Sequence, residues 1–289
     1  MVFGLVNLNK PGGMTSRQAI NRVGRLVRPA KVGHAGTLDP LATGVLIVGV
    51  GSATRLIQYV QRFPKSYLGT FLLGRQSPTE DVTGEVVEMA SPPLPTLAEL
   101  QSAAAALTGV IRQRPPAYSA LKVQGRRAYD LARRGEVPEL EAREIDVHRL
   151  QIVRYQYPEL VLSIACSSGT YVRSLGRDLA EAVGTAAVMS ALVRTAIGSF
   201  RLEEAVAPEQ LTPENVAQYL IAPLRALDGL PWVELSPPEV ALVRNGGFVQ
   251  RPTAGGNKEW VGLDSQGQPV TILVRRGDDL LGPSCNLLD

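Results

Sequence analysis

Cysteine and histidine are scarce in this chain of 289 residues, which holds two of each. Two cysteines, Cys166 and Cys285, cannot build the disulfide framework of a small secreted domain, and so few ligands disfavour a structural zinc site. Long apolar runs are also missing, because PLATGVLIVGVGSAT and AVGTAAVMSALV are shorter than a membrane span and contain glycine or proline. The N-terminus lacks the basic start of a secretory signal. We therefore expect a cytoplasmic protein without metal or membrane segment.

Acidic side chains are nearly absent from residues 1–79, where Asp39 is the one carboxylate among ten lysines and arginines. Residues 105–134 form a second basic cluster, with seven basic residues against one acidic. Residues 229–289 carry five basic and seven acidic side chains, which leaves 25 basic and 20 acidic for residues 1–228. Clustered positive charge favours a polyphosphate partner, because each neutralised phosphate releases counterions. Two solvated basic faces are the plainer alternative, but two clusters flanking one site favour nucleic acid.

The hydrophobic pattern predicts a mixed α/β chain in two parts. Prolines and a fall in basic charge at LPWVELSPPE indicate a boundary between a larger domain, residues 1–228, and a small β-rich domain, residues 229–289. In the larger domain, TSRQAINRVGRLVR predicts a helix capped by Thr15 or Ser16, and GVLIVGVG predicts a buried strand. VGHAGTLDPLATG is expected to be a long loop and SATRLIQYVQRF a capped helix.

Two later segments are also expected to be regular. Residues 143–166 predict two strands, the second with its apolar face on alternate residues from Leu160 onward. SLGRDLAEAVG predicts a helix that ends at Gly184. Arg173 lies in SSGTYVRS, where the strand gives way to the helix, and such junctions often hold functional residues. Alone it would be a surface arginine, but beside a carboxylate it would form an ion pair that orients the acid.

The segment GHAGTLDP, residues 33–40, carries the strongest chemical signal. Asp39-Pro40 alone is typical of a turn, because aspartate favours turns and proline restricts the residue before it. The glycines let a ligand approach the backbone closely, and the basic surroundings attract a polyanion. A carboxylate there can act as a nucleophile or stabilise a developing cation. His34 can serve as a general acid or base, or as a surface for a nucleobase, with a backbone-bonded turn histidine as the alternative.

Other signals are weaker. Tyr67 follows Lys65 at the start of an expected strand, where a tyrosine packs in the core more often than it takes part in catalysis. GVGSAT lacks the third glycine of a dinucleotide-binding loop and the lysine of a P-loop, so we expect no nucleotide site there. The sequence contains no recognisable Ser/His/Asp spacing, paired-carboxylate motif or metal-ligand cluster. Any enzyme here must work with one carboxylate, aromatic residues and arginines.

Five segments resemble, in this order, the bacterial tRNA pseudouridine synthase B (TruB) family: VNLNKPGGMTS, GHAGTLDPLATGVLIVGVGSATR, KSY, RPPAYSALKVQGRRAYDLARRG and CSSGTYVRSLGRDLAEAVG. The resemblance covers about residues 3–228, and the GHAGTLDPLATG block is highly specific to the family. The tail from LPWVELSPPEVALVRNGGFVQ onward resembles a PUA-type RNA-binding domain. An α/β (α+β) pseudouridine synthase fold is implied, with a central, mostly antiparallel sheet and a small C-terminal β-rich PUA-like domain.

The resemblance also implies an activity, the isomerisation of uridine 55 in the T loop of tRNA to pseudouridine, on a base flipped out of its stack. It implies that Asp39 is the catalytic nucleophile and that Arg173 pairs with it. Tyr67 matches the tyrosine that stacks on the target base and is implicated in proton transfer, and His34 matches the histidine associated with base flipping. Further matches to substrate-binding residues are Tyr171 and Leu192.

Partners and cofactors follow from the same resemblance. RNA contacts are expected at Lys10, Lys122 and Arg126, the last two in the segment that resembles the grip on the T arm of tRNA. The reaction is redox-neutral, so no cofactor is expected, and the protein is expected to be a monomer that needs no guide RNA. Three alternatives stay open: a tRNA-binding protein without catalysis, a hydrolase or phosphotransferase that uses Asp39, and a guide-RNA-dependent synthase.

Overall fold

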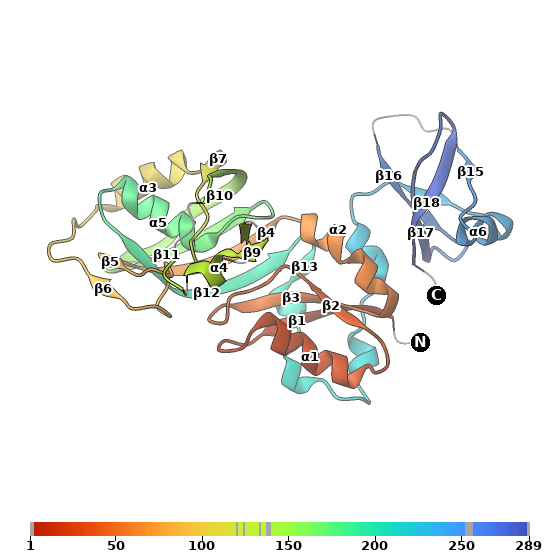
Figure 1. Ribbon diagram of the computed structural model, residues 1–289, viewed down its shortest axis with the longest axis horizontal. Helices are drawn as coiled ribbons and strands as arrows, with labels where there is room; N and C mark the ends of the chain where they lie inside the picture. Colours follow the sequence, from red (N-terminus) through yellow and green to blue (C-terminus); the bar gives the residue numbers. More distant parts are fainter. Residues whose placement is uncertain are drawn as a thin grey trace.

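The computed structural model describes residues 3–119, 121–123, 125–132, 134–136, 140–251 and 257–287 (Figure 1). A nine-stranded sheet runs in the order β1-β3-β12-β4-β11-β10-β7, with β2 added beside β3 and β13 beside β12. Its strands are β1 (Gly4–Lys10), β2 (Val32–Ala35), β3 (Thr43–Val50), β4 (Lys65–Leu73), β7 (Gly109–Gln113), β10 (Arg143–Gln156), β11 (Glu159–Cys166), β12 (Ala187–Ile197) and β13 (Phe200–Arg201). Only β3 and β12 pair in parallel, which confirms the mostly antiparallel sheet.

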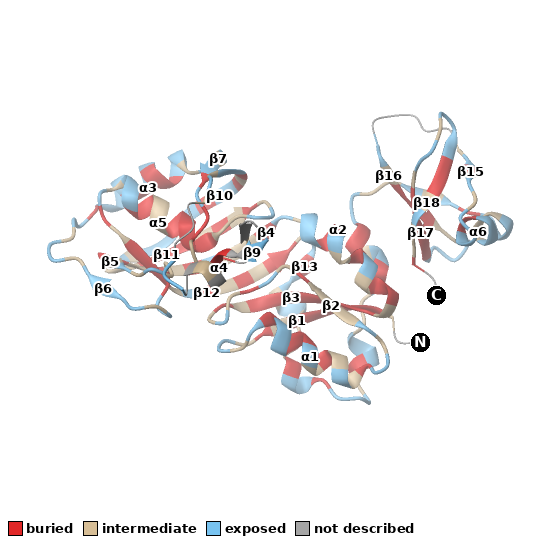
Figure 2. Ribbon diagram, viewed as in Figure 1, coloured by how far each residue is buried: buried red, intermediate tan, exposed pale blue. Residues whose placement is uncertain are grey.

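Helices cover the two halves of this sheet separately (Figures 1 and 2). Helix α1 (Ser16–Leu26) packs on β1 and β3 through its buried face, whereas α3 (Leu97–Ala106) and α5 (Val172–Ala182) pack on β4, β10 and β11. The shorter elements are η1 (Gly51–Leu56), α2 (Ile57–Arg62), β5 (Arg75–Gln76), β6 (Val87–Glu88), β8 (Lys122–Val123), β9 (Arg126–Arg127), α4 (Ala128–Ala132), η2 (Leu202–Glu204), η3 (Pro208–Gln210), η4 (Val216–Tyr219) and η5 (Pro223–Leu227). The parallel β3–β12 pair therefore lies where the two halves meet.

Local signals in the sequence explain where several elements begin and end. Thr15 caps α1 by accepting from the Gln18 backbone N–H, while the Gln18 side chain accepts from the Thr15 N–H, as in a capping box. Gly184 adopts a positive φ of 78° just beyond α5, which fits the predicted stop. The alternate residues of β11 from Leu160 to Cys166 are all buried, as predicted.

Two local predictions are wrong, and one central strand is not predicted. Val32–Ala35 is not loop but strand β2, because it pairs with β3 further along the chain. The segment after β3 begins as the 3-10 turn η1 at Gly51, which has a φ of 63°, and it has no side-chain cap, because its N-cap residue is Val50. Strand β12 lies at the centre of the sheet between β3 and β4, although its sequence carries no clear strand signal.

A second sheet of five strands forms the C-terminal part of the chain, in the order β14-β16-β17-β18-β15. Its elements are β14 (Trp232–Glu234), α6 (Pro237–Arg244), β15 (Val249–Gln250), β16 (Glu259–Leu263), β17 (Pro269–Arg275) and β18 (Leu280–Asn286). It has its own small core around Leu235, Val243 and Leu273. Glu259 joins it to α2, because its carboxylate accepts from Tyr59 at 2.9 Å and pairs with Arg62 at 2.7 Å. No helix in the described residues is long and apolar enough to cross a membrane.

Candidate active site

The loop that carries Asp39 joins β2 to β3 and is hydrogen-bonded to the start of α1. Ser16, at the start of α1, accepts a hydrogen bond from the Leu38 N–H at 2.9 Å, and its hydroxyl lies 3.1 Å from the Leu38 carbonyl. The Ala42 N–H donates to the Asp39 carbonyl at 3.0 Å, which closes a turn around Pro40. The backbone is thus fixed on both sides of Asp39, while the Asp39 side chain stays 38% exposed.

Lys10 supports the same loop and does not face solvent. Its side chain is fully buried, and its ammonium donates to three backbone carbonyls at 2.6–3.3 Å, one of them that of Pro40. Burial lowers the pKa of Lys10 to about 8, with the charge of Asp39 opposing this shift and that of Arg194 adding to it. The expected RNA contact at Lys10 is therefore corrected: the residue is a buried tether of the Asp39 loop.

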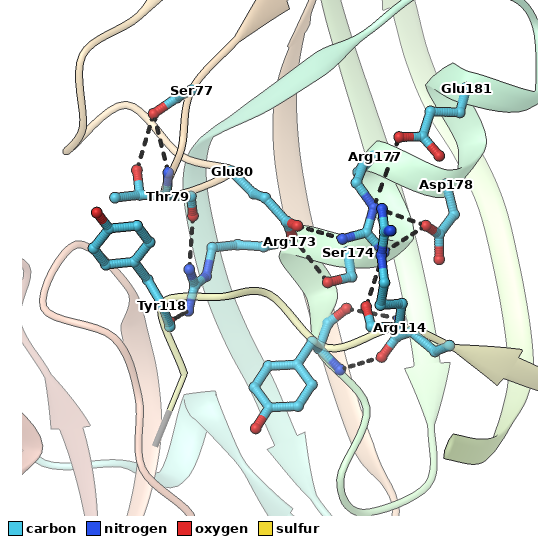
Figure 3. A network of polar contacts seen from close by, with 12 residues as sticks. Ser77, Thr79, Glu80, Arg114, Tyr118, Arg173, Ser174, Arg177, Asp178 and Glu181 are labelled. Carbon is cyan, nitrogen blue, oxygen red and sulfur yellow. Dashed lines mark hydrogen bonds and ion pairs between the residues drawn. The ribbon is translucent and has the colours of Figure 1, made fainter. Parts of the chain in front are cut away.

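Arg173 lies near the start of α5 and reaches Asp39. Its Nε is 3.0 Å from a carboxylate oxygen of Asp39, and its side chain is only 7% exposed. Its other nitrogens donate to the carbonyls of Thr79 at 2.7 Å and Tyr118 at 3.1 Å (Figure 3). A cation at a helix N-terminus opposes the helix dipole, so nearby carboxylates are needed to hold it there. Two residues far apart in the sequence thus form one ion pair.

A second carboxylate, that of Asp81, shares the Arg173 guanidinium at 3.8 Å from Nε. Asp81 is buried and accepts hydrogen bonds from the Thr79 hydroxyl at 2.7 Å and from the Thr83 N–H at 3.0 Å. The sequence analysis expected one carboxylate at this site, and that expectation is wrong, because Asp39 and Asp81 both contact Arg173 although they are 42 residues apart in the sequence. Threonines two residues before and after an aspartate, as in TEDVT, are the signal that could have found this anchored side chain.

A polar network beside this pair ties two loops to α5 (Figure 3). Glu80 has a positive φ of 59° and accepts from the Ser174 hydroxyl at 2.9 Å, besides pairing with Arg177. Arg177 also contacts Asp178 at 2.7 Å and donates to the Arg114 carbonyl at 2.8 Å. Burial raises the pKa of Glu80, and the charge of Arg177 opposes that shift. The arginines of α5, one turn apart, therefore fasten the loop at residues 77–83 and the start of the basic segment.

Tyr67 and Leu192 approach the Asp39 loop from the sheet. Leu192 on β12 is buried in the same apolar cluster as Leu38, the residue before Asp39, and Tyr67 on β4 packs against that cluster. Burial raises the pKa of Tyr67, while the positive charge of Arg194 opposes the shift. The structure thus brings together Asp39, Arg173, Tyr67 and Leu192.

Tyr171 and His34 lie at the edges of this group. Tyr171 precedes α5 and is fixed through its backbone, whose N–H and carbonyl both bond to the Gln113 side chain at 2.9 and 3.0 Å. His34 on β2 is half-buried, and burial followed by the charges of Arg17 and Arg194 lowers its pKa. Within the described part of the chain, no hydrogen bond or ion pair joins the His34 ring to Asp39.

Two predicted RNA contacts lie outside this group. Arg126 is exposed on β9, which pairs with β8 as a separate two-stranded ribbon. The side chain of Lys122 falls outside the described residues. Among the side chains that the structure describes, no cluster of three or more His, Cys, Asp or Glu could hold a metal ion.

Comparison with known proteins gives the family. The TruB family pseudouridylate synthase (N terminal domain) matches residues 24–172. The tRNA pseudouridine synthase B of Arthrobacter sp. (strain FB24) is 42% identical over 271 residues, 92% of this chain and 88% of that protein. That of Moorella thermoacetica is 40% identical over 263 residues, 87% of this chain and 86% of that protein.

Solved structures share the fold at lower identity. A Cbf5-Nop10-Gar1 complex contains a chain that matches with a TM-score of 0.79 and 22% identity, covering 99% of this chain and 85% of that one. This confirms the expected pseudouridine synthase fold. The specific sequence blocks, the fold and the 42% identity agree, and the chain belongs to the TruB family of pseudouridylate synthases.

Proposed function

We propose that the chain converts uridine 55 in the T loop of tRNA to pseudouridine, with Asp39 as the catalytic nucleophile on a flipped-out base. The Asp39–Arg173 ion pair is the observation that carries this proposal. Arg173 is buried and held by two carbonyls and a second carboxylate, whereas Asp39 is 38% exposed. The arginine therefore fixes a carboxylate that a ligand can still reach. The name tRNA pseudouridine synthase B, carried by relatives about 40% identical, supports tRNA as the substrate.

The reaction needs little beyond these groups. Pseudouridine forms when the N1–C1′ bond breaks, the uracil turns and C5 bonds to C1′, with one proton moving in net terms from C5 to N1. No oxidation, reduction or phosphate transfer occurs, so no cofactor is required by the chemistry. Asp39 can add to the base, attack C1′ or assist elimination from the ribose, and each route needs a carboxylate held beside the flipped nucleotide.

Further roles are proposed for the surrounding side chains. Tyr67 and Leu192 form the floor on which the target base rests, and Tyr171 borders it. His34 helps to extrude the base, as its place on β2 next to the Asp39 loop allows. Flipping costs a few kcal/mol of lost stacking and pairing, and contacts to phosphates offset that cost.

Positive charge near the site favours RNA. Exposed Arg126, with Lys122, is proposed to contact the T arm. Residues 1–228 are proposed as the catalytic domain and residues 229–289 as a PUA-like RNA-binding domain. The protein would act as a monomer in the cytoplasm, without a guide RNA.

The test uses an unmodified tRNA transcript whose uridines carry tritium at C5. We expect the wild-type chain to release tritium and form pseudouridine at position 55 without any guide RNA. Asp39→Asn should bind the transcript but release none, whereas Asp146→Asn, at an exposed aspartate on β10, should behave as wild type. Binding without tritium release by the wild type would contradict the activity, and turnover by Asp39→Asn would contradict the nucleophile. Turnover that EDTA does not affect would count against the hydrolase or phosphotransferase alternative.

A further inference from the structure

Arg194 is a buried cation without an acidic partner. Its side chain is 1% exposed, and among the described residues no carboxylate lies within ion-pair distance of it. Its Nε donates to the Val45 carbonyl at 2.7 Å and one terminal nitrogen donates to the Gly36 carbonyl at 3.0 Å. Tyr67 faces Arg194 across the sheet, as its direct partner on β4, and its side chain acts electrostatically on the guanidinium. Burying an unpaired charge destabilises the folded state, so Arg194 lowers the stability of the protein unless another group offsets its charge.

The fold brings the two side chains together through sheet register. Tyr67 on β4 and Arg194 on β12 are direct cross-strand partners, so their side chains lie on the same face of the sheet. Gly44 on β3 lets the backbone of Arg194 approach from the other side, because a Cβ there would overlap it. The same strand β3 then leads back to the loop of Asp39, whose charge also acts on Tyr67.

The one state of Tyr67 that would complement Arg194 is the phenolate. A buried phenolate is unfavourable by itself, because burial disfavours the charged form. Beside an unpaired guanidinium, however, a transient phenolate forms a buried ion pair and neutralises a charge that otherwise lacks a counterion. This pairing suits a tyrosine that loses a proton early in a reaction and regains one later.

We infer that Arg194 is a positioning residue that makes Tyr67 a proton shuttle between N1 and C5 of the uracil. The inference rests on the proposed function. After the N1–C1′ bond breaks, the Tyr67 hydroxyl gives its proton to N1, and Arg194 stabilises the phenolate. Once the C5–C1′ bond has formed, the phenolate takes the C5 proton and the C–H electron pair returns to the ring. Tyrosine and arginine end as they began, and the net change is one proton moved from C5 to N1.

A purely structural role for Arg194 predicts a different defect. The guanidinium also holds the carbonyls of Gly36 and Val45, on both sides of the Asp39 loop. If this were its only contribution, losing it would misplace Asp39 and slow the breaking of the N1–C1′ bond. Removal of the C5 proton would then remain fast, and deuterium at C5 would not alter the rate more than it does in the wild type.

The experiment compares single-turnover rates on tRNA transcripts carrying protium or deuterium at C5 of uridine. The variants are Arg194→Met, Arg194→Lys, Tyr67→Phe and the double variant Arg194→Met/Tyr67→Phe. Lys65→Met is the matched control, because Lys65 is a buried cation on β4 that donates to the Gln61 carbonyl. Folding of each variant is checked by circular dichroism and by tRNA binding.

We expect Arg194→Met to slow turnover by about 10²-fold, and Tyr67→Phe by about 10²–10⁴-fold, each with a larger C5 isotope effect than the wild type. Arg194→Lys, which keeps the charge, should recover part of the rate and lower the isotope effect. The double variant should be no slower than Tyr67→Phe, because both changes disable one step. Lys65→Met should leave the isotope effect unchanged.

Three results would overturn the inference. One is an Arg194→Met variant that turns over slowly but shows the wild-type isotope effect, which would mean that Arg194 only holds the Asp39 loop. Another is full additivity in the double variant. The third, which needs no folded Arg194 variant, is a Tyr67→Phe whose isotope effect equals that of the wild type. A wild-type chain that forms no pseudouridine would refute the proposed function instead, so the two failures are distinguishable.

Discussion

Asp81→Asn tests whether the second carboxylate holds Arg173 in place. Asparagine keeps the size of the side chain and an oxygen that can accept from Thr79 and Thr83, so the change removes mainly the charge. At an effective dielectric constant near 20, unit charges 3.8 Å apart attract by about 4 kcal/mol. Because Arg173 keeps Asp39 at 3.0 Å, we expect about half of this, ~2 kcal/mol, to be lost from the free energy of unfolding.

The same substitution should lower kcat by about tenfold to a hundredfold and leave KM nearly unchanged, because a displaced Arg173 misdirects Asp39 only at the chemical step. Urea titration measures the stability, and tritium release from tRNA measures the turnover. Asp146→Asn is the control, since Asp146 is 44% exposed and its partner His148 lies at 3.3 Å; it should change stability by less than about 0.5 kcal/mol. An Asp81→Asn variant with wild-type unfolding and turnover would refute the reasoning.

Three further predictions address the loop, the histidine and the RNA contacts. Gly44→Ala should lower the free energy of unfolding by about 3 kcal/mol, because φ is 101° and a Cβ would overlap the Arg194 backbone. Gly13→Ala, with φ 76° in open space, should lower it by about 1 kcal/mol. Equal urea midpoints of the two variants would contradict this. The His34 ring should titrate below 6.5 by NMR, because burial and nearby arginines lower its pKa. As pH falls through this range the unfolded chain gains a proton that the folded chain resists, so stability declines; a midpoint at or above 6.5 would be inconsistent. Arg126→Gln should weaken tRNA binding and reduce its salt slope by about 1, and an unchanged slope would argue against a phosphate contact.

Elements with local signals are predictable from this sequence. The cap at Thr15, the alternation from Leu160 and the stop at Gly184 each depend on neighbours within one or two turns. Strand β12 is different, because it is buried in the centre of the sheet and mixes Ser190 and Arg194 into an apolar run. Its buried face holds Arg194 between Leu192 and Ala196, while the apolar Ala191 is exposed, so hydrophobicity does not mark that face and the pairing partners define the strand.

Some residues of the candidate site are likewise predictable from the sequence and others are not. Asp39 stands out because it is the one acid in a basic stretch, and Arg173 because it lies at a strand-to-helix junction. Asp81 carries only the weak mark of its flanking threonines, and Lys10 and Arg194 carry none, since a charged residue in a sequence is normally a surface residue. Their burial follows from contacts between segments distant in the chain, which residue patterns do not encode.

The most direct test of the central claim is the modification state of position 55 in tRNA from cells that lack this chain. We predict that uridine remains unmodified there, that the wild-type chain restores pseudouridine, and that a folded Asp39→Asn variant does not. Pseudouridine at position 55 without the chain, or its restoration by Asp39→Asn, would contradict the account.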